Sequence, residues 1–214
     1  MKTGKILLFG LLSLWGVCAP ARADEQSARL LDQMRNQMRP WTSYRVEFTA
    51  SIEGQGTTNG TLTVSGQRFA ARVGGQELYF DGTTLWNYLS QNNEVTIERL
   101  DPEQPNVLSN PSRLLAVDPA DYLHRSLPDV STAGGGTLRV VELTPKVQTQ
   151  DYTTITLYLD PKTALPKRIS IATPSSDKPM EMTLRKLQTR VPVSEATFRF
   201  DPKAHPGVEV IDFR

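Results

Sequence analysis

The sequence contains a single cysteine and only two histidines among its 214 residues. Because Cys18 lies in the apolar N-terminal segment, the rest of the chain has no thiol for a disulfide, a nucleophile or a cysteine-based metal site. His124 and His205 are far apart and lack the HxH and HExxH spacings of metal ligands, so we interpret both as surface histidines. These absences exclude a disulfide-stapled fold and thiol chemistry, and we expect neither a metal nor a cofactor.

Blocks of like charge and long hydrophobic runs are also missing. The 24 basic and 23 acidic residues give a formal net charge of +1 and are interspersed, which argues against nucleic acid as a partner. The main apolar run, Ile6 to Val17, is shorter than the roughly 20 residues of a transmembrane helix. The composition is therefore typical of a neutral, soluble domain.

The first 23 residues have the features of a secretory signal peptide. A basic start and the apolar run lead to an A-x-A cleavage site at residues 21–23, directly before Asp24. The alternative is a lipoprotein anchor acylated at Cys18, although Val17 stands where a small residue is usual. We expect cleavage, an exported mature chain with a formal charge of −2, and one domain over residues 24–214.

The hydrophobic pattern changes from a helical to a strand period after Pro40. Between residues 24 and 39, apolar side chains recur at a spacing of four, which predicts a helix that Pro40 ends. From Tyr44 on, apolar and polar residues alternate in about ten short segments, two of them joined by an Asp81-Gly82 hairpin turn. This pattern predicts a mainly β (α+β) fold in which an antiparallel sheet curls or closes.

Residues 101–129 interrupt the strand pattern with five prolines and two apolar clusters. We predict short helices over 112–117 and 119–127 in this insertion. The second would start with Pro119 at the first helical position, where proline is permitted.

No arrangement of residues typical of an active site is recognisable. The serines lack the G-x-S-x-G context of a nucleophile elbow, and AGGGT at 133–137 lacks the G-K-[ST] ending of a phosphate-binding loop. Asp81 precedes Gly82 at a predicted turn and Glu94 ends another, so we interpret both carboxylates as turn residues. We predict no catalytic residues. The alternative, an enzyme acting on lipid or glycan, would need polar groups converging inside a cavity.

The aromatic residues after the Asp-Gly turn raise a question about what covers the sheet. Trp86 and Tyr88 share one face of a strand, while Leu85 and Leu89 point to the other face. A strand that is apolar on both faces needs cover on each side. A helix over the second face and a hydrophobic cavity lined by this strand both fit the pattern.

Six segments, in order along the chain, resemble the periplasmic outer-membrane lipoprotein carriers, the LolA-like proteins. They are "YRVEFTA" (44–50), "GTLTVSGQRFAAR" (60–72), "YFDGTTLWNY" (79–88), "NPSRLL" (110–115), "VELTPK" (141–146) and "ATFRFDPKAHPGVEVID" (196–212). The most recognisable is the Asp-Gly turn followed by Leu-Trp and an aromatic residue.

The resemblance implies a half-open antiparallel β-barrel with an N-terminal helix and a helical lid insertion at about 101–129. It also implies a periplasmic carrier that accepts acylated lipoproteins from an inner-membrane transporter and delivers them to an outer-membrane receptor. We expect a monomer. The alternative is a non-shuttling acceptor or envelope sensor on the same fold.

The resemblance and the strand pattern together suggest where acyl chains would bind. The candidate cavity residues are Val46, Phe48, Leu62, Val64, Phe69, Phe80, Trp86, Tyr88, Ile155 and Leu157. Ordinary core packing is the alternative for each. Leu114, Leu115 and Leu123 are the candidate lid residues, expected to fill the empty cavity. Many family members have an arginine that is thought to hold the lid closed. Residues 65–67 read Ser-Gly-Gln at that place, so we expect the lid to be held differently or the cargo to differ.

Overall fold

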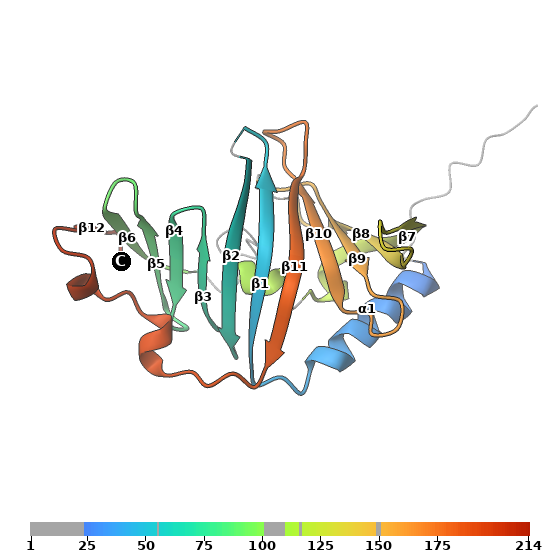
Figure 1. Ribbon diagram of the computed structural model, residues 1–214, viewed down its shortest axis with the longest axis horizontal. Coiled ribbons are helices and arrows are strands. Elements are labelled where there is room, and N and C mark those ends of the chain that lie inside the picture. Colours follow the sequence, from blue (N-terminus) through green and yellow to red (C-terminus); the bar gives the residue numbers. More distant parts are fainter. Residues whose placement is uncertain (1–23, 55, 101–109, 116, 149–150) are drawn as a thin grey trace, which may run out of the picture.

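The computed structural model describes residues 24–54, 56–100, 110–115, 117–148 and 151–214 (Figure 1). The predicted signal peptide, Cys18 and the first part of the predicted lid, residues 101–109, lie outside these described residues. The first elements in chain order are α1 (Glu25–Met38), β1 (Ser43–Ile52), β2 (Gly56–Ser65), β3 (Arg68–Val73), β4 (Gln76–Phe80), β5 (Thr84–Leu89) and β6 (Glu94–Arg99).

The second half of the chain combines strands with short 3-10 helices. Its elements are η1 (Pro111–Leu114), η2 (Pro119–Asp121), β7 (Tyr122–Ser131), β8 (Thr137–Pro145), β9 (Thr154–Leu159), β10 (Pro166–Ala172), β11 (Met180–Thr189), η3 (Glu195–Phe198), η4 (Pro202–Ala204) and β12 (Glu209–Asp212).

All these strands belong to one sheet, in the order β12-β6-β5-β4-β3-β2-β1-β11-β10-β9-β8-β7. Two runs of hairpins, β1 to β6 and β7 to β11, meet where β1 pairs antiparallel with β11. The C-terminal β12 returns to the far edge and pairs parallel with β6. The antiparallel, mainly β fold predicted from the alternating pattern is confirmed.

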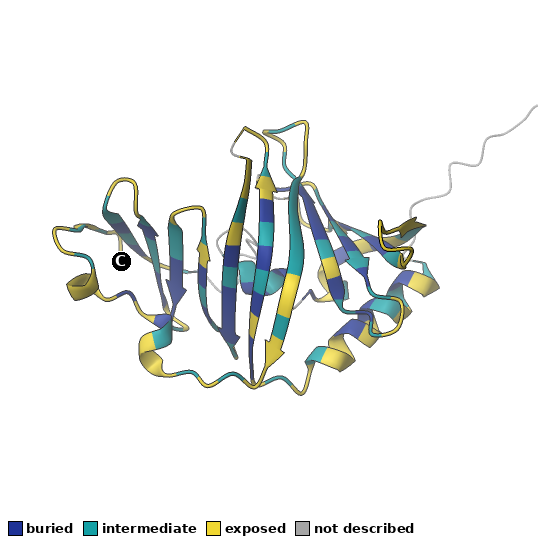
Figure 2. Cartoon of the chain, viewed as in Figure 1, coloured by how far each residue is buried: buried dark blue, intermediate teal, exposed yellow. Residues whose placement is uncertain are grey.

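One face of the sheet carries the main core, and we call it the inner face. The sheet curls, and η1 is visible behind it in Figure 1, between its two halves. Apolar side chains from β1–β5 and β7–β10 form one buried cluster with residues of α1 and of the segment around η1, and partly buried side chains of β11 pack against it. Figure 2 shows the buried positions alternating along the central strands. The architecture is therefore a half-open barrel with an N-terminal helix.

Helix α1 begins immediately after Asp24, which is its N-cap residue. Asp24 has extended backbone geometry, and its carboxylate accepts a hydrogen bond from the Ser27 N–H at 2.6 Å. Leu31 and Met34 are fully buried, and the helix ends two residues before Pro40, as predicted. No helix within the described part of the chain is long and apolar enough to cross a bilayer.

The predicted helix over 119–127 is wrong. Residues 119–121 form η2, but Tyr122–Ser131 is β7, the edge strand that pairs with β8. In this stretch Tyr122, His124 and Ser126 alternate with other residues at a strand period, which the surrounding prolines obscured. The first predicted helix, over 112–117, is a single 3-10 turn, η1.

Candidate functional site

Cross-strand pairing brings most of the predicted cavity residues together. Those that share the buried inner-face cluster are Val46, Phe48, Leu62, Val64, Phe69, Phe80, Ile155 and Leu157. Phe69 pairs with Val64 on one side and with Phe80 on the other, and it is 0% exposed. The ring centroids of Phe69 and Phe80 are 5.5 Å apart. These residues form one continuous apolar surface that spans both halves of the sheet.

Trp86 and Tyr88 do not belong to this surface, and their predicted place beside Phe69 is corrected. They point to the outer face of β5, in a second cluster with Phe200. The Tyr88 ring lies 5.3 Å from the Phe200 ring and 4.4 Å from the His205 ring. The C-terminal segment, defined as residues 190–214, thus covers the second apolar face, where the sequence suggested a helix or a cavity.

Two further predictions are corrected on β7. Leu123 was a candidate lid residue, but its side chain is 44% exposed and lies on the outer face of the edge strand. His124, its neighbour, points inward and is buried, with Nδ1 2.7 Å from the Ser27 Oγ on α1. The interpretation of His124 as a surface histidine is therefore wrong. Its partner is 97 residues away in sequence, so no local pattern could have revealed the contact.

Helix α1 and the lid segment, defined as residues 110–115 and 117–118, cover the inner face. Leu31 and Met34 of α1 are 0% exposed, and Leu114, Leu115 and Val117 of the lid segment are buried in the same cluster. Because a helix and a short loop cover the inner face here, rather than a second sheet, movement of either would uncover apolar surface. Leu114 and Leu115 are thus buried against the inner face, and their role as lid residues stays a prediction.

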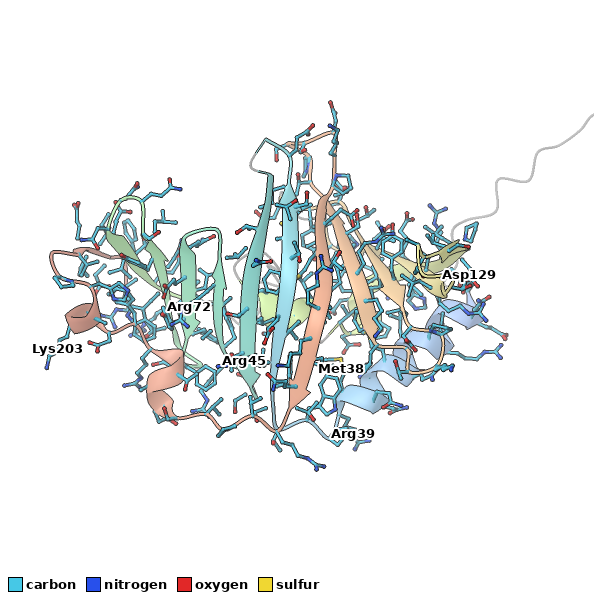
Figure 3. The ribbon with its side chains drawn as sticks, in the orientation of Figure 1. Met38, Arg39, Arg45, Arg72, Asp129 and Lys203 are labelled. Atoms are coloured by element: carbon cyan, nitrogen blue, oxygen red, sulfur yellow. The ribbon has the colours of Figure 1, made fainter. Side chains whose placement is uncertain are left out.

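A cavity of about 670 Å³ lies where α1, the lid segment and the start of β1 meet, and we call it the mouth cavity. Its apolar lining is formed by Met38, Trp41, Tyr44, Val64, Leu115 and Val117. Asp32, Arg35, Asn36, Arg39 and Asp118 make its polar rim. Figure 3 shows Met38 and Arg39 at the end of α1.

The mouth cavity is partly removed from water. Burial raises the pKa of Tyr44, as expected of a hydroxyl removed from water. The volume is within the range of about 300–1,000 Å³ that is usual for ligand pockets.

Two sets of polar contacts hold α1 in place. At the rim of the mouth cavity, Arg35 lies 3.9 Å from the Asp118 carboxylate of the lid segment. At the other end of the helix, the Asp24 carboxylate accepts hydrogen bonds from the Ser126 N–H at 2.5 Å and from the Ser126 hydroxyl at 3.0 Å. Partial burial disfavours the charged form, but the hydrogen bonds from Ser27 and Ser126 outweigh it and lower the pKa of Asp24 to about 2.

The arginine nearest to the position of the family arginine serves another part of the molecule. Arg68 starts β3 and contacts Glu195 at 2.5 Å, and its guanidinium lies 5.0 Å from the Phe198 ring centroid. Both partners belong to η3 in the C-terminal segment. Arg68 therefore fastens the C-terminal segment, whereas Arg35 makes the ion pair with the lid segment.

The two carboxylates considered for chemistry are separated by the length of β5. Asp81 accepts hydrogen bonds from the Thr83 and Thr84 N–H groups at 3.1 and 3.0 Å, so its predicted role as a turn residue is confirmed. Glu94 begins β6, opposite Leu89 at the other end of β5. Within the described residues, no three His, Cys, Asp or Glu side chains gather where they could hold a metal ion.

The geometry defines an open, curled sheet whose apolar inner face is shielded by a helix and a lid segment. The profile of the family described as "Outer membrane lipoprotein carrier protein LolA" matches residues 53–201, which is more than half of the chain. The chain therefore belongs to the LolA family. A comparison with curated proteins gave no match.

Solved structures resemble this fold at low sequence identity. An uncharacterized conserved protein from Thermus thermophilus is 13% identical, with a TM-score of 0.58 over 88% of this chain and 100% of its own. A DUF1329 family protein from Desulfovibrio piger is 15% identical, with a TM-score of 0.50 over 86% and 99%. A LolA superfamily protein from Nitrosomonas europaea is 13% identical, with a TM-score of 0.44 over 82% and 98%. The first two likenesses show the fold alone.

Proposed function

We propose that this protein is a soluble periplasmic carrier that binds the acyl chains of lipoproteins on its inner face and ferries them from the inner to the outer membrane. The observation that carries this proposal is the cover of that face. A continuous apolar surface that includes Phe69 is shielded by α1 and the lid segment and opens into the mouth cavity. A removable cover over apolar surface suits a ligand that must be hidden from water and then released.

The energetics of acyl chains favour such a cover. Each buried CH₂ contributes about 0.8 kcal/mol, so one acyl chain of ordinary length represents on the order of 10 kcal/mol. Release without a nucleotide requires a competitor for the same surface. Leu114 and Leu115 are buried there in this structure, and burial of each contributes about 1.5–3 kcal/mol. Lid closure thereby lowers the net affinity for the lipoprotein, so that an acceptor with higher affinity can remove it.

The partners belong to the same proposal. Acylated lipoproteins would come from an inner-membrane transporter and pass to an outer-membrane receptor, and the predicted signal peptide would place the chain between the two membranes. The family's description as a lipoprotein carrier supports this direction of transport.

The test is a release assay with spheroplasts of the source cell. Purified protein is incubated with them, and the supernatant is analysed for acylated lipoproteins beside a Phe69→Glu variant. A charge at this fully buried position should abolish release. Leu123→Glu, the same charge on the exposed outer face of β7, is the matched control and should release as much as the wild type.

Two outcomes would contradict the carrier. If the folded wild type releases nothing and copurifies with another lipid or a membrane-anchored protein, the acceptor or sensor function replaces it. If Phe69→Glu folds and releases lipoproteins normally, the inner face is not the binding surface.

A further inference from the structure

The inner face opens at both ends of the central strands. A second cavity, of about 300 Å³, lies at the end opposite the mouth cavity, among Ile52 of β1, Thr58 of β2 and the turns that follow β3 and β5. The mouth cavity contains Tyr44 and Val64 from the same two central strands. Tyr44 and Ile52 are eight residues apart on β1, which corresponds to roughly 27 Å along the strand.

Phe48 stands midway between the two cavities. It is four residues from both Tyr44 and Ile52 on β1, points to the inner face and is 8% exposed. Its partner across β1 and β2 is Gly60. A Cβ atom at Gly60 would lie 2.4 Å from Cζ and 2.5 Å from Cε2 of Phe48, so the aromatic ring occupies the space that any other residue at position 60 would fill. The ring therefore lies over Gly60 of the neighbouring strand, at a level of the inner face between the two cavities.

A β-bulge on the other side of β1 marks the same level of the sheet. Glu47 pairs with Lys186 but Phe48 pairs with Leu184, which leaves Arg185 as an extra residue in β11. Bulges change the direction in which neighbouring side chains point. A glycine under an aromatic ring occurs in ordinary sheets as a packing device. Here Gly60, the Phe48 ring and the bulge in β11 lie at the same level of the sheet, and this level is between the two cavities.

We propose that Phe48 divides the acyl-binding surface of the inner face into two compartments, one next to each cavity, and thereby sets the length of the acyl chain that binds. This inference rests on the proposed function, because it assigns chain-length selectivity to the same surface. A chain entering from the mouth cavity extends along β1 until it meets the Phe48 ring. Longer chains reach the second compartment only when that ring moves off Gly60.

The compartments predict a characteristic dependence of affinity on chain length. Burial of about 0.8 kcal/mol per CH₂ corresponds to an affinity gain of about fourfold for each methylene that stays inside. The gain should stop once the chain reaches Phe48, because further methylenes remain in water. Without the ring, the gain should continue with longer chains.

The experiment is calorimetric titration with octanoate, laurate, palmitate and arachidate, each below its micelle concentration. Wild type should gain affinity about fourfold per methylene up to a limit at or before palmitate. Phe48→Ala should continue to gain through arachidate. Gly60→Ala should shift the limit to shorter chains, because the new methyl group pushes the ring towards the bound chain.

The double variant Phe48→Ala/Gly60→Ala separates the ring from the glycine. With the ring gone, the nearest neighbour of the new Cβ is the Arg72 carbonyl oxygen at 3.0 Å, which a small shift relieves, so this variant should behave like Phe48→Ala. Phe80→Ala is the matched control, since it removes a buried aromatic of the same face that lies on β4 and not on β1. It should weaken all chains by the same factor.

The outcomes separate the two proposals. Binding of fatty acids with the same length limit in wild type and Phe48→Ala, or with no limit in either, overturns the divider and leaves the carrier standing. If Phe48→Ala does not fold, an unchanged limit in Gly60→Ala overturns the divider. If folded wild type binds none of the four fatty acids, both proposals are wrong: the inner face does not bind acyl chains, and Phe48 cannot limit their length.

Discussion

Asp24 joins two elements that are distant in sequence with one carboxylate. It caps α1 through the Ser27 N–H and also accepts hydrogen bonds from Ser126 on β7. The second contact occupies a backbone N–H on the free edge of the sheet, where an unpaired strand could otherwise pair with another chain. Beside it, the hydrogen bond between Ser27 and His124 is buried. This end of α1 is therefore fixed, whereas the other end borders the mouth cavity.

Replacing Asp24 with Asn keeps a side chain that can cap α1 but removes the charge, so it should lower the free energy of unfolding at neutral pH by about 1 kcal/mol, the usual difference between a charged and a neutral hydrogen bond. The folded-state pKa of about 2 lies below the ordinary value of 3.8. The stabilisation is thus fully present above roughly pH 4 and lost as the pH falls towards 2. Urea unfolding across this range should show the two proteins converging in acid. A constant difference down to pH 2 would contradict the role of the charge.

Among the elements, the lid segment is the proposed competitor for the inner face. Its 3-10 turn is too short to be stable alone, so the burial of its leucines against the sheet holds it in place. A segment held mainly by side-chain burial can leave when another apolar group takes that surface.

The variant Leu114→Ser/Leu115→Ser should bind palmitate more tightly than wild type, since the lid segment no longer competes for the surface. The expected gain reflects the burial of two leucines, about 1.5–3 kcal/mol each at most. The protein without lipid should also be less stable. Fluorescence displacement and urea unfolding would measure both effects. Unchanged binding in a folded variant would show that the lid segment does not compete.

The C-terminal segment is the second cover, on the outer face. Phe200 lies between Tyr79 and Tyr88, with ring centroids at 6.1 and 5.3 Å. Beyond it, β12 extends the sheet by pairing with β6. The segment is fastened at its start by Arg68 and Glu195 and at its end by the β12 hydrogen bonds.

Replacing Phe200 with Ala should therefore destabilise the protein by about 3 kcal/mol, as for other buried phenylalanines. Trp86 packs against the same cluster, so its fluorescence should shift to the red. Phe213→Ala is the control, because that side chain is 71% exposed and should change neither quantity. Equal stability of the two variants would mean that the C-terminal segment contributes little to the fold.

In the whole molecule, the proposed uptake of an acyl chain would require α1 and the lid segment to separate. They meet at the rim of the mouth cavity through Arg35 and Asp118. This ion pair is half exposed and contributes at most about 1 kcal/mol, so it guides closure without preventing opening.

A covalent bridge at this place should block uptake. In the chain from Asp24 onward, which contains no other cysteine, Arg35→Cys/Asp118→Cys would be joined with a short bifunctional thiol reagent. The cross-linked protein should no longer bind palmitate, while the untreated variant binds it. Glu25→Cys/Arg29→Cys, an adjacent pair within α1, is the control and should bind with or without the linker. Normal uptake by the bridged protein would show that the inner face opens elsewhere.

The alternating pattern was enough to predict the sheet and most of the side chains on its inner face. Strict alternation in residues such as Val46, Phe48, Leu62 and Val64 fixes which side chains share a face, because successive residues of a strand point to opposite sides. The Asp81 turn and the end of α1 at Pro40 were also predictable, since both depend on local backbone chemistry.

The cover of each face and the side-chain contacts between strands could not be predicted in this way, because they depend on how the distant parts of the chain fold together. Trp86 and Tyr88 are apolar and alternate correctly, but the segment that covers them lies more than 100 residues away. His124, the strand at 122–131 and the contact of Phe48 with Gly60 depend in the same way on partners set by strand pairing. A period of two shows that a strand has two faces, whereas the inward face and its neighbours follow from how the whole sheet curls.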